Sequence, residues 1–320
     1  MKHALSLSFT IRPRDTTNTY AHYQPWFFDK YLNRFEKLTS LRLASVCLDF
    51  NITKDSPPGI KVLTLEGCHV QVSAFVTLVR SLPELVHLKL IEVRYHGYVR
   101  QNNPAPRFSQ SLRKLSVARP SWICFEILGM LFPVPWDKVS VSWGEIVGST
   151  QGFIDRVSAN ATSLHLQENM ARTYRDASYN PAMGTLKKKS TIDLRHHLSL
   201  SKCQKLRKLK ICGNKPHEYE IDTIGTIESM EIQKIIFTQS RALCLPASDS
   251  YWTKLDQFLC ALVNRPECSG QLEVEFRVVD FHQGYGVMRG NYLPDFRRCN
   301  RAEVKFVDAE GEIIHFRGKQ

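Results

Sequence analysis

The sequence predicts an α/β solenoid, in which repeated strand–helix units stack side by side. Three observations favour this fold class. A short phrase, apolar-x-x-apolar-x-apolar, recurs along the chain. Its copies start at similar intervals. Between copies, the apolar residues fall at helical spacing, so each unit supplies one strand and one return helix.

The repeated phrase has six clear copies and two degenerate ones. The clear copies are LTSLRL from Leu38, IKVLTL from Ile60, LVHLKL from Leu85, LRKLSV from Leu112, LRKLKI from Leu206 and IESMEI from Ile227. The degenerate copies are WDKVSV from Trp136 and ATSLHL from Ala161. Successive starts differ by 22, 25, 27, 24, 25, 45 and 21 residues. Leucine-rich repeats have units of about 20–29 residues, so the long interval has room for a divergent unit.

Each copy predicts a strand with one buried side. In LVHLKL, Leu88 and Leu90 point to one face, whereas Lys89 between them points to the other. We expect Leu65, Leu90 and Leu115 to be almost fully buried at matching positions. The expected strands, side by side in one mostly parallel sheet, cover 41–44, 62–66, 87–91, 114–118, 139–142, 163–167, 208–212 and 229–233. A further strand is expected at LEVEF from Leu272.

The segments between strands predict helices on the opposite face of the sheet. Residues 69–85 place Val72, Phe75, Val79 and Leu82 at helical spacing. Similar helices fit residues 121–132, 144–161 and 250–265. One strand and one helix cannot bury their apolar side alone, so neighbouring units must stack.

Two segments make up the expected domain organisation. Residues 1–37 form an N-terminal capping segment, with the strand-like LSLSF and then aromatic residues at a spacing of three to four. Tyr23, Phe27 and Tyr31 fit a helix that covers the open end of the stack. Residues 38–320 form the leucine-rich-repeat domain, with irregular C-terminal units.

Composition favours an intracellular protein, cytoplasmic or nuclear. No apolar run approaches the ~18 residues needed to cross a bilayer, so no membrane partner is expected. The nine cysteines are scattered and contain no C-x-x-C pair, which indicates a reducing compartment.

No motif for catalysis, a cofactor or a metal ion is found. G-x-S-x-G, H-E-x-x-H and the P-loop are absent, and Gly284–Gly290 has the wrong spacing for a dinucleotide fingerprint. The adjacent His196 and His197 do not have the spacing of a chelating pair on a helix. We therefore predict no catalytic, cofactor-binding or metal-binding residues and a non-enzymatic protein. An enzyme whose site escapes these motifs remains the alternative.

Charge is concentrated in residues 187–215. The whole chain has a formal net charge of +12, and this stretch holds ten Lys or Arg residues against the single acid Asp193. It fits either a solvated exterior or a patch that binds an anion. Because the stretch lacks interleaved aromatic residues for base stacking, binding of nucleic acid or another polyanion is the alternative function.

The concave face of the stack is the predicted binding surface for a protein partner. Solenoids use such extended surfaces, and the residues between the inward leucines, with their outward neighbours, line this one. The candidate partner-binding residues are Arg42, Thr64, Glu66, Lys89, Lys114, Ser116, Ser140, His165, Gln167, Lys208, Lys210 and Glu231.

Three stretches carry a family resemblance: LTSLRLASVCL from Leu38, the long unit from Ile60, and SLRKLSV from Ser111. They resemble the leucine-rich-repeat region of fungal F-box-type proteins, most clearly over 38–166 and more loosely over 206–306. In such proteins an N-terminal F-box docks on a cullin-RING ubiquitin ligase, and the repeats hold the substrate. The resemblance implies substrate recognition for a ubiquitin-ligase adaptor, although residues 1–37 contain no F-box.

Overall fold

The computed structural model of the 320-residue chain divides into two compact units. The N-terminal unit is Met1–Ser142 with Gly148–Val157, and the C-terminal unit is Trp143–Val147 with Ser158–Gln320. The structure describes residues 6–10, 35, 37–48, 59–97, 111–119, 124, 127–128, 136–143, 147–157, 159–168, 198–213, 218–239, 249–265, 272–278 and 302–307. The expected capping helix, Gly284–Gly290 and the pair His196 and His197 lie outside these residues.

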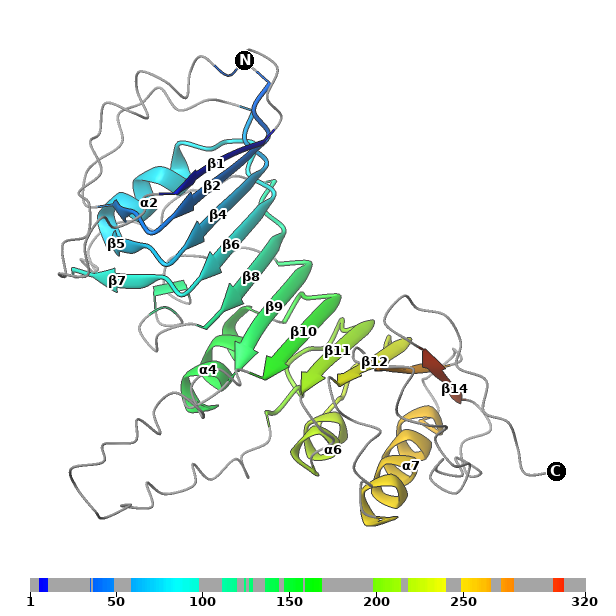
Figure 1. Ribbon diagram of the computed structural model, residues 1–320. Coiled ribbons are helices and arrows are strands. Elements are labelled where there is room, and N and C mark those ends of the chain that lie inside the picture. The colour runs from blue at the N-terminus through cyan, green and yellow to red at the C-terminus, as the bar shows by residue number, and fades with distance from the viewer. Residues whose placement is uncertain are drawn as a thin grey trace, which may run out of the picture. The chain divides into compact units, whose positions relative to one another are not determined.

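The strands of the N-terminal unit lie side by side in sequence order, and each neighbouring pair is parallel (Figure 1). This order confirms the strands expected from the first copies of the phrase. It also adds the N-terminal strand to the same sheet. The strands are β1 (Ser6–Thr10), β2 (Ser40–Ala44), β4 (Val62–Glu66), β6 (His87–Ile91), β8 (Lys114–Ala118) and β9 (Lys138–Trp143).

Apolar residues at equivalent repeat positions form columns beneath these strands. The register aligns Leu65 with Leu90 and Val117, all at most 2% exposed. Leu115 is also buried, but it aligns with Leu88 in the neighbouring column, so its expected match with Leu90 is wrong. A third column is fully buried just before the strands: Leu38, Ile60, Leu85, Leu112 and Trp136. Trp136 therefore fills the leucine position of its degenerate unit.

A left-handed residue follows each of four successive strands, at Ser45, Gly67, Glu92 and Arg119. Their φ angles are 57°, 58°, 53° and 49°. The first three donate a backbone N–H to the last residue of the next strand, as in the Gly67 bond to Ile91 at 2.8 Å. The chain then enters a small second sheet that the sequence analysis did not predict. This parallel sheet contains β3 (Cys47–Leu48), β5 (His69–Gln71) and β7 (Arg94–His96).

Two helices of the N-terminal unit agree in part with expectation. Helix α2 (Val72–Arg80) starts after β5, so it is shorter than the expected 69–85 helix. Its Phe75 is buried and meets Tyr95 edge to face, with ring centroids 5.3 Å apart. Helix α4 (Val147–Val157) buries Phe153 and Ile154.

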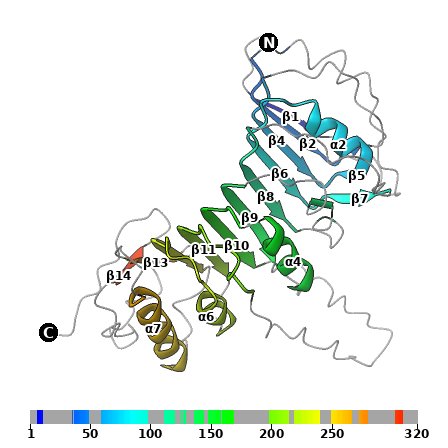
Figure 2. The ribbon, with the colours of Figure 1, turned by 180° about the vertical axis from the view of Figure 1, so that it is seen from behind.

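The C-terminal unit continues the strand–helix pattern. Its parallel strands are β10 (Ser163–Glu168), β11 (Lys208–Gly213), β12 (Lys234–Gln239), β13 (Leu272–Val278) and β14 (Ala302–Val307). Helices α6 (Glu218–Gly225) and α7 (Asp249–Val263) pack together (Figure 2). The Tyr251 hydroxyl on α7 donates to Glu220 on α6 at 3.1 Å. A Cβ added at Gly225 would lie 2.5 Å from the Phe258 ring, so the close approach of these helices requires glycine.

The expected strand at 229–233 is wrong. Strand β12 begins at Lys234, and the true copy of the phrase is IQKIIF, with Ile232, Ile235 and Phe237 buried. Met230, expected to point inward, is 45% exposed in the turn before the strand. The correct register stacks Phe237 on Phe276, with ring centroids 4.8 Å apart. With this correction, the described strands and helices form the predicted α/β fold of leucine-rich-repeat type.

Candidate partner-binding face

The residues between the buried leucines share one face in each unit, here called the open face. The leucine positions are buried, whereas most residues between them are half-buried or exposed. The register lines up the middle residue of each strand in a row. In the N-terminal unit this middle row is Ser8, Arg42, Thr64, Lys89, Ser116 and Ser140. In the C-terminal unit it is His165, Lys210, Ile236, Glu275 and Lys305.

The structure places eleven of the twelve candidate residues on the open face. Seven lie in the middle rows just given. Lys114 and Lys208 begin their strands, and Glu66 and Gln167 lie near the ends of theirs. Glu231 is the exception. It lies in the turn before β12 and pairs with Arg207 at 2.7 Å, while Ile236, only 2% exposed, takes the middle position.

Two candidate residues form an ion pair with each other on the N-terminal open face. Arg42 Nε donates to Glu66 Oε2 at 2.9 Å, from β2 to β4. Both side chains are more than a third exposed, so the pair contributes little to stability. Its charges are largely offset before any partner arrives.

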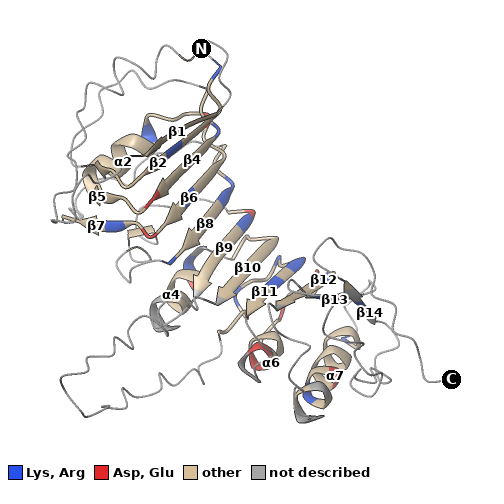
Figure 3. Ribbon diagram, in the orientation of Figure 1, with Lys and Arg blue, Asp and Glu red and all other residues tan. Residues whose placement is uncertain are grey.

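Three lysines on neighbouring strands form what we call the lysine cluster: Lys89, Lys114 and Lys138. Lys114 and Lys138 are direct cross-strand neighbours, and Lys89 lies on β6 next to Ser116 of β8. Figure 3 shows Lys and Arg segments on β6 and β8. Among the residues that the structure describes, no carboxylate forms an ion pair with any of the three.

His87 reports the electrostatics of the lysine cluster. It lies opposite Lys114 in the register, and its Nε2 is 2.9 Å from the Ser116 hydroxyl. Burial, followed by the charges of Lys89 and Lys114, lowers the pKa of His87 to about 4. The imidazole is therefore neutral at pH 7, beside a site of positive potential.

The His87–Ser116 pair does not complete a hydrolytic triad. A nucleophilic serine needs a basic histidine that a third group orients. Within the described part of the chain, no carboxylate contacts His87, and a pKa near 4 makes it a weak base. The arrangement supplies a polar neutral contact on the open face.

A second histidine lies on the open face of the C-terminal unit. His165 Nε2 is 3.0 Å from Cys212 Sγ, across β10 and β11. Burial, followed by the charge of Lys210, lowers the pKa of His165 to about 4. Burial raises the pKa of Cys212. Both groups are uncharged at pH 7, so the pair lacks the thiolate that a nucleophilic cysteine needs.

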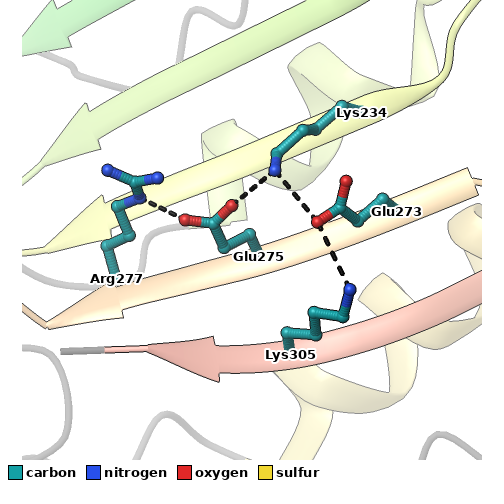
Figure 4. Close-up of polar contacts among 5 residues, drawn as sticks. All are labelled: Lys234, Glu273, Glu275, Arg277 and Lys305. Carbon is teal, nitrogen blue, oxygen red and sulfur yellow. Dashed lines mark hydrogen bonds and ion pairs between the residues drawn. The ribbon is translucent and has the colours of Figure 1, made fainter. Parts of the chain in front are cut away.

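A network of opposite charges occupies the open face of β12, β13 and β14 (Figure 4). Lys234 Nζ lies 2.9 Å from Glu273 and 2.7 Å from Glu275, Arg277 also bonds Glu275, and Lys305 lies 3.7 Å from Glu273. The Glu275 side chain is only 5% exposed. Its burial alone would raise its pKa, but hydrogen bonds from Arg277 and Lys234 lower the pKa below the ordinary value.

Sequence reasoning missed the cations of this network. The incorrect strand at 229–233 hid the outward position of Lys234. The available signal was the alternation of charged and apolar residues in LEVEFRV and AEVKFV. That alternation does not show which strands are neighbours.

The basic stretch 187–215 lies only partly within the described residues. Residues 187–197 and 214–215 lie outside them. In the described part, Lys205 Nζ donates to Asn160 at 3.2 Å and Arg207 pairs with Glu231. Lys208 is exposed and Lys210 half-buried, both on the open face.

Three further properties concern only the described residues. No group of three or more His, Cys, Asp or Glu side chains there is arranged to hold a metal ion. No helix in the described ranges has both the length and the apolar character to span a membrane. The six described cysteines are thiols that form no disulfide, and Cys212 and Cys260 are half-buried whereas the other four are buried.

No family model and no curated protein matches the sequence. Among solved structures, the chain is similar to LegL7, a leucine-rich-repeat-containing protein from Legionella pneumophila. The TM-score is 0.46 at 14% identity, over 97% of this chain and 92% of that one. It is also similar to human 5T4, the trophoblast glycoprotein or Wnt-activated inhibitory factor 1, with TM-score 0.45 at 12% identity, over 80% and 84%. For an internalin, inlF, from Listeria monocytogenes, the TM-score is 0.30 at 12% identity, and the alignment covers 85% of this chain and 75% of that one.

Proposed function

We propose that this chain is a non-enzymatic protein-interaction module that binds a partner protein through its open face. One observation carries the proposal. Successive parallel strands hold polar side chains in register on the face opposite the leucine core. A rigid face of this kind presents many side chains to one partner at low entropic cost, which is how solenoid proteins are generally used.

Site-specific photo-crosslinking tests this proposal. A crosslinkable amino acid at Thr64, in the middle row, should capture a defined protein from extracts of the native cell. The same amino acid at Ser73, exposed on helix α2, is the matched control. The captured protein is then purified, and its binding is measured with Thr64→Tyr and Ser73→Tyr variants. Loss of binding in Ser73→Tyr but not in Thr64→Tyr would assign the interface to the helical side.

A finer proposal follows from the resemblance to F-box-type proteins. The bound protein would then be a substrate presented to a cullin-RING ubiquitin ligase. Purification of the chain from the native cell should recover the ligase adaptor and cullin together with the substrate. Recovery of the substrate alone would support a protein-interaction module and contradict a role in a ubiquitin ligase.

Binding of a polyanion through 187–215 is the second candidate function. Lys208 and Lys210 favour it, because they lie on the open face and form no ion pair with a described carboxylate. The affinity for single-stranded DNA should then fall steeply with salt, since each neutralised phosphate releases a counterion. Lys208→Gln with Lys210→Gln should reduce that slope. An unchanged slope would argue against this function.

A further inference from the structure

We infer that the lysine cluster of Lys89, Lys114 and Lys138 is a binding site for an acidic segment of a partner protein. The inferred occupant is an extended run of Asp and Glu residues lying across β6, β8 and β9. This inference rests on the proposed function and specifies the chemistry of the partner at one place on the open face.

The geometry concentrates positive charge on adjacent strands. Lys114 and Lys138 are paired in the register, so their backbones are one strand spacing apart, about 4.8 Å. Lys89 and Lys114 are diagonal neighbours on β6 and β8. Lys138 is exposed and the other two are half-buried, so partner carboxylates have access to the ammonium groups.

The cluster is unfavourable for the isolated fold. Like charges directly opposite each other on neighbouring strands are destabilising. Burial is the main cause of the low pKa of His87, and the charges of Lys89 and Lys114 lower that pKa as well, which agrees with this positive surrounding. Elsewhere in the same unit the chain pairs its cations, as in Arg42 with Glu66 and Arg119 with Glu92. Residues that cost stability without local compensation are typical of functional sites.

Charge complementarity favours an acidic protein segment over nucleic acid. The rows of the cluster contain Ser116, Ser140 and His87 beside the lysines, and no Phe, Tyr or Trp side chain on which a base would stack. A protein segment offers separate carboxylates to the lysines and backbone groups to the two serines.

The test measures binding of a short fluorescein-labelled glutamate peptide to the full chain by fluorescence anisotropy at low ionic strength. A glutamine peptide of the same length is the neutral probe. The triple variant Lys89→Gln, Lys114→Gln, Lys138→Gln should bind the glutamate peptide at least about tenfold more weakly, because three favourable charge interactions are lost. Lys114→Arg keeps the charge and should keep the binding.

A matched control removes the same amount of charge elsewhere. Lys37→Gln, Arg80→Gln and Arg94→Gln change exposed residues that lie outside β6, β8 and β9. This variant should keep most of the affinity. Equal losses in both triple variants would show a response to net charge alone and would overturn the site. Retention of affinity by the lysine-cluster variant would also overturn it.

Comparison with other anionic ligands tests which chemical group the lysine cluster prefers. Tighter cluster-dependent binding of heparin or single-stranded DNA would make the cluster a polyanion site and overturn the inference. Tighter binding of a phosphoserine peptide than of the glutamate peptide would assign it to phosphorylated partners instead. Circular dichroism melting checks that the variants fold. If the triple variant does not fold, Lys138→Gln alone, at the exposed position, must still lower the affinity.

The two proposals fail in different ways. If the partner captured at Thr64 binds the lysine-cluster variant normally, the acidic-segment inference fails and the open-face interaction stands. If crosslinking and purified binding assign every partner to the helical side, the proposed function fails even where the glutamate peptide binds.

Discussion

The two units carry lysines at equivalent repeat positions, but these lysines have different surroundings. Lys114 begins β8 in the N-terminal unit, with His87 and Lys138 as its cross-strand neighbours. Lys234 begins β12 in the C-terminal unit, where it contacts Glu273 and Glu275 (Figure 4). Burial alone would lower the pKa of Lys234, but the hydrogen bonds that its ammonium group donates to Glu275 and Glu273 raise the pKa above the ordinary value.

This difference separates structural charge from charge that is available to a partner. Around Lys234 the chain supplies its own counter-ions, and the nearly buried Glu275 is satisfied by Lys234 and Arg277. Around Lys114 the described residues supply none. The same repeat geometry thus produces a self-neutralised patch around Lys234 and a cationic patch around Lys114. Counting charges along the sequence does not distinguish the two.

The largest effect is expected when a leucine is removed from the core behind the open face. Leu90→Ala should lower the free energy of unfolding by ~2–5 kcal/mol, because the residue is 1% exposed and its removal leaves a cavity. Lys89→Ala, one residue away on the open face, should change stability by less than ~0.5 kcal/mol. Urea denaturation measures both. Similar effects would mean that the two faces of β6 are assigned incorrectly.

The second largest effect on stability is expected when the central carboxylate of the C-terminal network, that of Glu275, is removed. Glu275→Gln should destabilise the protein by ~1–3 kcal/mol, because two cations lose a nearly buried partner. The lower end of that range is favoured, since Lys234 and Arg277 remain 26% and 37% exposed. Glu231→Gln, in an exposed pair with Arg207, is the control and should cost less than ~1 kcal/mol. If Glu231→Gln destabilises the protein as much as Glu275→Gln does, the nearly buried network is no more important for stability than the exposed ion pair.

Substitution of the two equivalent lysines, Lys234 and Lys114, is expected to change stability in different directions. Lys234→Gln should lower stability because it leaves Glu273 and Glu275 with fewer partners. Lys114→Gln should leave stability unchanged or raise it by ~0.2–1 kcal/mol, because repulsion from Lys138 is relieved. Paired melting curves in low salt measure the difference, and added salt should reduce it. Destabilisation by both substitutions would contradict the comparison.

The smallest effect is the pH dependence from His87 and His165. Both folded pKa values are about 4, below the ordinary 6.5, so the unfolded chain binds these protons first as the pH falls. Their contribution to stability is therefore complete above pH 6.5 and is lost as the pH falls toward 4. His87→Gln with His165→Gln should flatten the change in melting temperature between pH 7 and 5. An identical change in both proteins would show that neither histidine contributes.

The sequence by itself determined the repeat and its buried positions. The spacing of leucines predicted seven strands at the observed places, namely β2, β4, β6, β8, β9, β10 and β11, and β13 was expected as well. It also identified Lys89, Lys114 and Ser116 as outward residues, because alternation along a strand is a local property. Eleven of the candidate residues therefore lie on the open face.

Only the tertiary structure decided the register at β12 and the pairing of charges. The segment from Ile227 matches the repeated phrase as well as IQKIIF does, and lateral bonds such as Lys234 N–H to Arg207 O select the second. Lys234 meets Glu273, 39 residues later, only because β12 and β13 are neighbours. Side-chain periodicity follows from the backbone of one strand, whereas charge neutralisation depends on which strands lie side by side.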